Sequence, residues 1–108
     1  MQRDFTYIDD IVEGVIRIQK VIPTGDIPYR LYNIGNNEPI ELIRFIKAIE
    51  TATGKTAEKI YLDMQPGDVV RTYADIDRLQ KAVGYTPTTS IEEGIERFVG
   101  WYKGYAIT

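Results

Sequence analysis

The stretch RLYNIGNNEPIELIRFIKAIETATG, residues 30–54, decides the fold class. It opens with a β-prone run over 30–34, which the letters GNN then halt. Pro39 suits the first turn of a helix, and apolar residues at helical spacing continue from there to a stop at Gly54. The pattern therefore predicts a short strand followed by a helix over 40–53.

A second β-prone run, 59–63, follows this helix. A strand, a helix and a second strand within roughly 34 residues have the size of a βαβ unit, whose crossover makes the two strands parallel. We expect one small helix-rich α/β domain over 1–108, with a βαβ unit and a short, incomplete, largely parallel sheet.

Other elements are expected on both sides of this unit. Residues 4–8 alternate aromatic and β-branched side chains like a strand, and a helix over 9–21 follows, with Asp10 and Glu13 spaced as a capping box. The remaining patterns predict a loop over 23–28, a short strand within 69–74, a helix that Asp75 caps and Gly84 ends, and a last helix opened by a capping box at Ser90.

The composition excludes several classes of protein. The chain has 108 residues, of which 44% are apolar, and a formal charge of 13 − 16 = −3, which suits one globular core. It has no cysteine and no histidine, so disulfides, Ser-His-Asp hydrolysis and Cys or His zinc sites are excluded. Only all-oxygen Mg²⁺ or Ca²⁺ sites stay open, and we assign no metal site.

Charge and hydropathy also bear on partners and location. The basic residues are scattered through a mildly acidic chain, so we expect neither nucleic acid nor a membrane surface as a partner. No run approaches the ~20 apolar residues that a membrane span needs, and the first residues do not form a signal peptide. A cytoplasmic location is the expectation.

Two glycine-containing stretches fail as cofactor motifs. Gly54-Lys55-Thr56 resembles the end of a phosphate-binding loop, but Ile49 stands where that loop requires glycine. Gly35 follows a β-prone run, yet the second and third glycines of a dinucleotide fingerprint are missing. These two stretches therefore predict no cofactor site in this chain.

Paired carboxylates and two arginines are the remaining candidates for chemistry. The pairs Asp9-Asp10 and Asp75/Asp77 stand at predicted helix starts, which favours capping. Asp63 and Asp68 flank a loop at the carboxyl end of a predicted parallel strand, where ligand sites gather. Arg3 and Arg71 suit either bidentate contact with a phosphate or an ordinary solvated surface.

Five motifs in order carry a family resemblance. They are RDFTYIDDI at 3–11, YNIGN at 32–36, QPGDV at 65–69, TYAD at 72–75 and GYTP at 84–87. Together they resemble the C-terminal part of extended short-chain dehydrogenase/reductase enzymes that act on nucleotide sugars, most of all the NAD-dependent UDP-glucuronate 4-epimerases. The resemblance covers nearly the whole chain.

The resemblance implies a division of labour. In that family an N-terminal Rossmann domain binds NAD, and a smaller lobe closes over the UDP-sugar. The family moves the proton with a Tyr-x-x-x-Lys pair, and no tyrosine here has lysine four positions later. We therefore expect a substrate-binding lobe without catalytic residues or cofactor, with NAD held by a longer parent enzyme.

The same resemblance suggests which residues meet the substrate. It implies that Arg3 contacts the diphosphate of UDP and that Asp68 lies near the ribose or uracil. Gln65 stands where the family often has a second phosphate arginine, and Arg71 is a candidate to supply that charge. Tyr73 and Tyr85 are expected in the core.

Other interpretations stay open from sequence alone. Within the same family, the lobe could serve a 4,6-dehydratase or a decarboxylase. From another class, the chain could be a free-standing interaction module with an exposed apolar face. If the Rossmann domain is missing, the surface it leaves bare should cause weak self-association.

Overall fold

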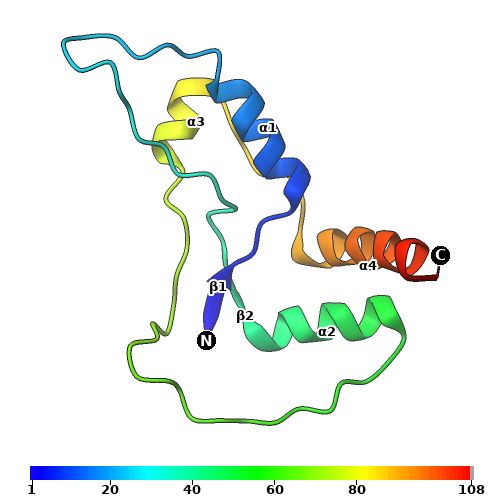
Figure 1. Cartoon of the computed structure of the whole chain (residues 1–108). Coiled ribbons are helices and arrows are strands. Elements are labelled where there is room, and N and C mark those ends of the chain that lie inside the picture. Colours follow the sequence, from blue (N-terminus) through cyan, green and yellow to red (C-terminus); the bar gives the residue numbers. More distant parts are fainter. Residues whose placement is uncertain (108) are drawn as a thin grey trace.

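The computed structural model describes residues 1–107, with side chains placed through Ala106. Figure 1 shows a small sheet between two helix pairs, α1 with α3 at one end and α2 with α4 at the other. No described helix is long and apolar enough to span a bilayer. The elements in chain order are β1 (Gln2–Asp4), α1 (Ile8–Ile18), β2 (Pro39–Glu41), α2 (Leu42–Thr53), α3 (Asp77–Val83) and α4 (Ile91–Ile107).

Strand β1 is the centre of the sheet. It pairs with β2 in antiparallel register, with Arg3 opposite Ile40. On its other edge, the N–H of Gln2 donates to Val70 O at 2.8 Å and Thr72 N donates to Gln2 O at 3.1 Å, a single parallel bridge. The α/β class and the short sheet are thus confirmed, and the expected strand within 69–74 is reduced to this bridge.

The βαβ unit and the parallel sheet direction need correction. Residues 30–34 and 59–63 form no strand, and the two named strands run antiparallel. The 59–63 run was expected to pair with 30–34, which forms no strand, and both edges of β1 are occupied by β2 and by residues 70–72.

Helix α2 is confirmed, but its start was wrong. Pro39 lies at the first position of β2 instead of in the first helical turn, a place where a strand tolerates its missing N–H. Gly54 ends the helix with φ of +71°, and its N–H donates to Glu50 O at 2.9 Å. Only a residue free to adopt the left-handed region ends the helix this way at low cost.

The other helices follow the predicted order with changed caps. Helix α1 ends at Ile18, short of the predicted 21, and its N-cap residue Tyr7 makes no side-chain cap. The capping box of Asp10 with Glu13 is therefore wrong, since Glu13 instead pairs with Arg17. The box at Ser90 is present in its first half, because Glu93 N donates to Ser90 Oγ at 3.2 Å.

The main core lies between α1 and α3. Its buried members are Ile76, Leu79 and Tyr85, against which Ile18 and Ile34 pack. Tyr85 is confirmed as a core residue. The same expectation for Tyr73 is wrong, because this side chain is half exposed beside Arg71.

The most apolar face of α1 points outward. Ile8, Val12, Val15 and Ile16 share one side of the helix and remain 44–65% exposed. In an amphipathic helix such a face normally packs on a core. The described part of the chain provides no cover for it, so α1 presents an apolar surface to its surroundings.

Candidate functional site

Arg3 is held at the middle of the sheet. It lies in β1, between β2 on one side and the 70–72 segment on the other. The Arg3 side chain is half-buried, and its Nη1 donates to Gln2 O at 2.8 Å. The guanidinium keeps further N–H donors for a ligand, since an arginine side chain carries five.

Gln65 and Asp68 are the ends of one tight turn. The N–H of Asp68 donates to Gln65 O at 3.1 Å, and Gly67 has φ of +90°, which favours glycine. The turn is exposed, and within two residues it enters the segment bonded to β1. The backbone thus connects these two predicted site residues directly to the strand of Arg3.

Arg71 lies next to β1 but faces the other way. As the bridge partner of Gln2 it shares the side of the sheet opposite to Arg3, because successive strand residues alternate faces. Its guanidinium carbon lies 5.2 Å from the centre of the Tyr73 ring. Arg71 and Gln2 also line a cavity of about 490 Å³ that Arg3 does not touch.

Asp4 joins three parts of the chain beside this site. Its carboxylate accepts hydrogen bonds from the backbone N–H of Asn36 at 3.1 Å, of Asn37 at 3.0 Å and of Ala74 at 2.9 Å. Asp4 belongs to the motif at 3–11, and no role was predicted for it. No signal in the sequence indicated this role, because the predicted strand over 4–8 put Asp4 at a strand start, whereas β1 ends at Asp4 and its carboxylate satisfies unpaired backbone donors there.

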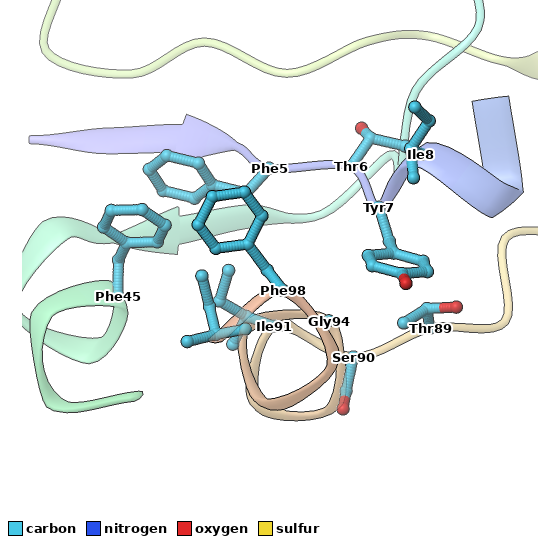
Figure 2. Close-up of a pocket in the computed structure, with 11 residues that line it drawn as sticks. Phe5, Thr6, Tyr7, Ile8, Phe45, Thr89, Ser90, Ile91, Gly94 and Phe98 are labelled. Carbon is cyan, nitrogen blue, oxygen red and sulfur yellow. The ribbon is translucent and has the colours of Figure 1, made fainter. Parts of the chain in front are cut away.

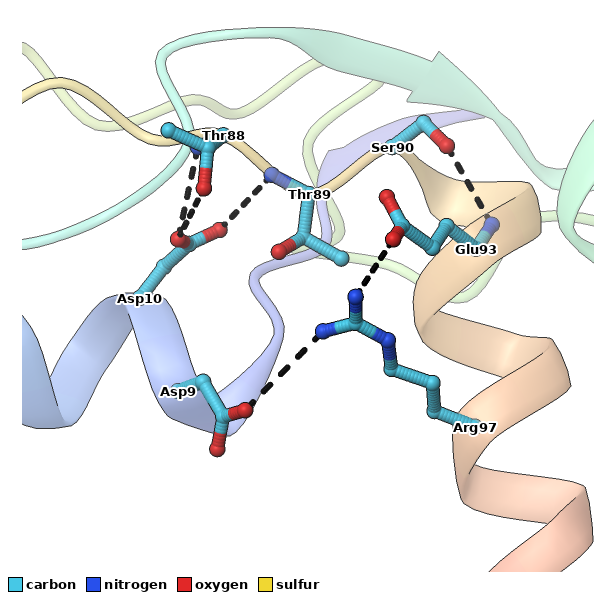
Figure 3. A network of polar contacts seen from close by, with 7 residues as sticks. All are labelled: Asp9, Asp10, Thr88, Thr89, Ser90, Glu93 and Arg97. Atoms are coloured by element: carbon cyan, nitrogen blue, oxygen red, sulfur yellow. Dashed lines mark hydrogen bonds and ion pairs between the residues drawn. The ribbon is translucent and has the colours of Figure 1, made fainter.

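The acidic pair at the start of α1 links that helix to α4 (Figure 3). Asp10 is buried and accepts from Thr88 N at 3.3 Å, Thr88 Oγ1 at 3.3 Å and Thr89 N at 3.1 Å. Asp9 lies 4.0 Å from Arg97 of α4. The predicted capping role of Asp9 and Asp10 is therefore wrong. Both side chains make tertiary contacts instead, because their partners lie outside α1.

Tyr85 connects the core to the turn near Asp4. Its buried hydroxyl donates to Gly35 O at 2.9 Å. Burial raises the pKa of Tyr85, and the negative charges of Asp10 and Asp4 raise it further. The phenol is therefore held in its neutral, donating form.

The apolar cavity between the two helix pairs offers no chemistry (Figure 2). It has a volume of about 290 Å³ and no charged side chain in its lining. Phe5 and Phe45 stack on one side with ring centres 4.2 Å apart, and Phe98 of α4 faces them. Its lining residues Ile8 and Phe98 are more than half exposed, so it is an open apolar groove where the sheet meets α4.

The strand–helix junctions of this chain do not fit a dinucleotide. Residues 5–7 join β1 to α1 without a glycine, and β2 runs straight into α2. The first turn of α1 carries Asp9 and Asp10, which would repel a pyrophosphate. Across residues 1–107, no three carboxylates gather as a metal site would require.

Comparison with known proteins finds similar sequences, UDP-glucuronate 4-epimerases among them. CapI of Staphylococcus aureus is 44% identical over an alignment of 119 positions, which covers 97% of this chain and 36% of CapI. The UDP-glucuronate 4-epimerase of Thermodesulfobacterium geofontis is 42% identical over 102 residues, covering 94% of this chain and 30% of the relative. The chain is homologous to the UDP-glucuronate 4-epimerases. No family model matches it.

Structural comparison agrees with this homology. The UDP-glucuronic acid 4-epimerase of Bacillus cereus, solved with UDP-glucuronic acid and NAD, superposes with a TM-score of 0.78 at 32% identity. The match covers 94% of this chain and 32% of that epimerase. The resemblance read from the five motifs is confirmed, and the chain spans about a third of the length of these UDP-glucuronate 4-epimerases.

Proposed function

We propose that this chain is the UDP-sugar-binding lobe of a NAD-dependent UDP-glucuronate 4-epimerase and does not turn over substrate by itself. The observation that carries the proposal is the 42% identity to a UDP-glucuronate 4-epimerase over 94% of the chain. The similar Bacillus cereus epimerase was solved with both UDP-glucuronic acid and NAD. This chain corresponds to a third of that protein, so the remaining two thirds would supply the other parts.

In this proposal the substrate lies along β1 and the turn next to it. Arg3 would donate to the diphosphate, because a guanidinium forms strong charge-assisted bonds with phosphate oxygens. Gln65 and Asp68 would contact the nucleotide from their turn, whose end is bonded to β1. Arg71 would be a peripheral member of the site, since it leaves the sheet on the other face.

Hydride transfer would belong to a Rossmann domain in the longer protein. The strand–helix junctions described above lack the glycines that a dinucleotide needs, and the first turn of α1 carries two carboxylates. The outward apolar face of α1 supports a missing neighbour, because exposed patches of this kind mark interfaces. That face also suits a free-standing interaction module, the competing function.

A titration with UDP tests the binding role. We expect the chain to bind UDP with a Kd of about 1 mM or weaker, because an isolated lobe leaves much of a ligand pocket open. Arg3→Ala should weaken binding about tenfold or more, the loss of one charge-assisted hydrogen bond. Arg78→Ala is the matched control, because it removes the same charge from the exposed surface of α3.

Three results separate the candidates. Amide shifts in NMR that concentrate at residues 2–4 and 65–72, and that weaken in the Arg3 variant alone, support the lobe. An absence of binding up to 20 mM, roughly twentyfold above that Kd, favours the interaction module. Conversion of UDP-glucuronate by this chain with added NAD would contradict an inactive lobe, and the same assay on a full-length parent identifies the reaction.

A further inference from the structure

Asp4 occupies the point where the neighbours of Arg3 are joined. It follows Arg3 at the end of β1, and its carboxylate accepts from the backbone on both sides of that strand. On one side, Asn36 and Asn37 belong to the turn that leads into β2. On the other side, Ala74 follows the segment that carries Arg71.

The three bonds engage both oxygens of the Asp4 carboxylate. Oδ1 accepts from Asn36, while Oδ2 accepts from both Asn37 and Ala74. Because Oδ2 receives one donor from each side, it acts as a bridge between two segments that are 37 positions apart in the chain (74 − 37). A side-chain amide cannot replace it, since an amide carries only one acceptor oxygen.

The space around this bridge is closed. A Cβ added to Gly35 would lie 2.5 Å from the Cβ of Ala74 and 3.0 Å from Asp4 Oδ2. The turn and the 72–74 segment therefore touch backbone against side chain. The separation of the two segments is set by contact as well as by the hydrogen bonds.

We propose that Asp4 is a positioning residue for recognition of the nucleotide diphosphate. It fixes both neighbours of β1, and through the 70–74 segment it holds the Gln65–Asp68 turn at a constant place relative to Arg3. It does so without touching the ligand, because its oxygens are occupied by backbone donors. This inference rests on the proposed function.

Charge alone predicts the opposite effect, which makes the inference testable. Asp4 is an anion beside the residue proposed to bind another anion. Its neutralisation would therefore strengthen UDP binding if electrostatics decided the outcome, by Coulomb's law. If positioning decides, the same change weakens UDP binding.

The experiment compares Asp4→Asn with Asp26→Asn. Both remove one negative charge, and Asp26 lies in the exposed loop over 23–28. We expect the Asp4 variant to bind UDP about tenfold more weakly, judged from the initial slope of the amide shifts, and the Asp26 variant to match the wild type. Uridine, which has no phosphate, should lose less affinity than UDP does in the Asp4 variant, because it loses only the contacts of the Gln65–Asp68 turn.

A double variant tests whether Asp4 acts through Arg3. In an Arg3→Ala background, Asp4→Asn should cause a smaller loss than it does in the wild type, because the guanidinium being positioned is gone and only the Gln65–Asp68 turn remains affected. Additive losses would overturn the positioning role. An unchanged or improved affinity of the single Asp4 variant would overturn it as well.

A second pair of variants covers the case in which Asp4→Asn does not fold. Gly35→Ala should push the 72–74 segment away and weaken UDP binding, and Ala74→Gly in the same chain should restore part of it by removing the 2.5 Å contact. Failure of the second change to restore binding would contradict the inference. If Arg3→Ala itself leaves UDP binding unchanged, the proposed function fails instead.

Discussion

Removal of one oxygen atom from the core gives the sharpest test of the fold. Tyr85→Phe deletes the hydroxyl that donates to Gly35 O at 2.9 Å. The ring itself remains, and it is only 1% exposed, so the packing between α1 and α3 is kept. The change therefore isolates one hydrogen bond between the core and the turn beside Asp4.

The size of the effect follows from what is left behind. Gly35 is buried, so its carbonyl would lose its partner without gaining water. An unsatisfied buried acceptor costs ~1–3 kcal/mol of folding free energy. For a domain of this size, each 1 kcal/mol lowers Tm by about 4–8 °C, so a fall of at least about 4 °C is expected.

The pH dependence gives a second, independent readout. Burial, followed by the charges of Asp10 and Asp4, raises the pKa of Tyr85 in the folded state. The stability this contributes is fully present below the unfolded pKa of about 10, and it is lost as the pH rises from there through the folded pKa. The Tyr85→Phe variant has no phenol to ionise and cannot lose stability in this way. The difference in unfolding free energy between the wild type and this variant should therefore become smaller above about pH 10.

Urea unfolding followed by circular dichroism measures both effects. Tyr61→Phe is the control, because that side chain is 80% exposed and loses the same atom. An unfolding free energy for Tyr85→Phe within about 0.5 kcal/mol of the wild type at pH 7 would refute the role given to this hydrogen bond. A gap that stays constant from pH 7 to 11 would refute the assigned pKa direction.

Three further outcomes are expected. The hydrogen bond from Arg44 lowers the pKa of Glu92 in the folded state. The ion pair therefore stabilises the fold, by at most ~1 kcal/mol at this exposed site, above about pH 4.3, and this stabilisation is lost as the pH falls below that value. Arg44→Ala should shift the urea midpoint at pH 7 but not at pH 3. Asp10→Asn should cost ~1–3 kcal/mol in urea unfolding, while exposed Asp9→Asn stays near the wild type. Val12→Glu should reduce weak self-association in sedimentation equilibrium, and a strictly monomeric wild type at high concentration would count against an uncovered α1 face.

Local signals in the sequence located the described helices, although the start of α2, the end of α1 and the cap of α1 were wrong. Gly54 and Gly84 end α2 and α3 in the left-handed region, and Ser90 opens α4 as its spacing predicts. These features depend on residues within one turn of each other, so the sequence contains the needed information. The periodicity of Tyr85 among apolar residues likewise placed it in the core.

Pairing between segments far apart in the sequence could not be predicted from local patterns. The run 59–63 has the composition of a strand, but no edge of β1 is free to receive it. The tertiary bonds of Asp4 and Asp10 reach partners 70 and 78 positions away, beyond the range of any capping rule. Family motifs located these acids, and only the structure separates their bridging role from ligand contact.

The bridge that Asp4 forms between two backbone segments affects how variant libraries of such lobes should be interpreted. A screen that scores growth or product would mark Asp4, Gly35 and Arg3 alike as intolerant positions, although under the proposed function only Arg3 contacts the ligand, while Asp4 and Gly35 hold segments of the sheet together. Substitutes chosen by charge would then mislead an engineer who wants a new sugar specificity. Side chains in the exposed turn from Gln65 to Asp68, apart from Gly67, can be changed without breaking the sheet, and under the proposed function such changes would alter contacts with the nucleotide.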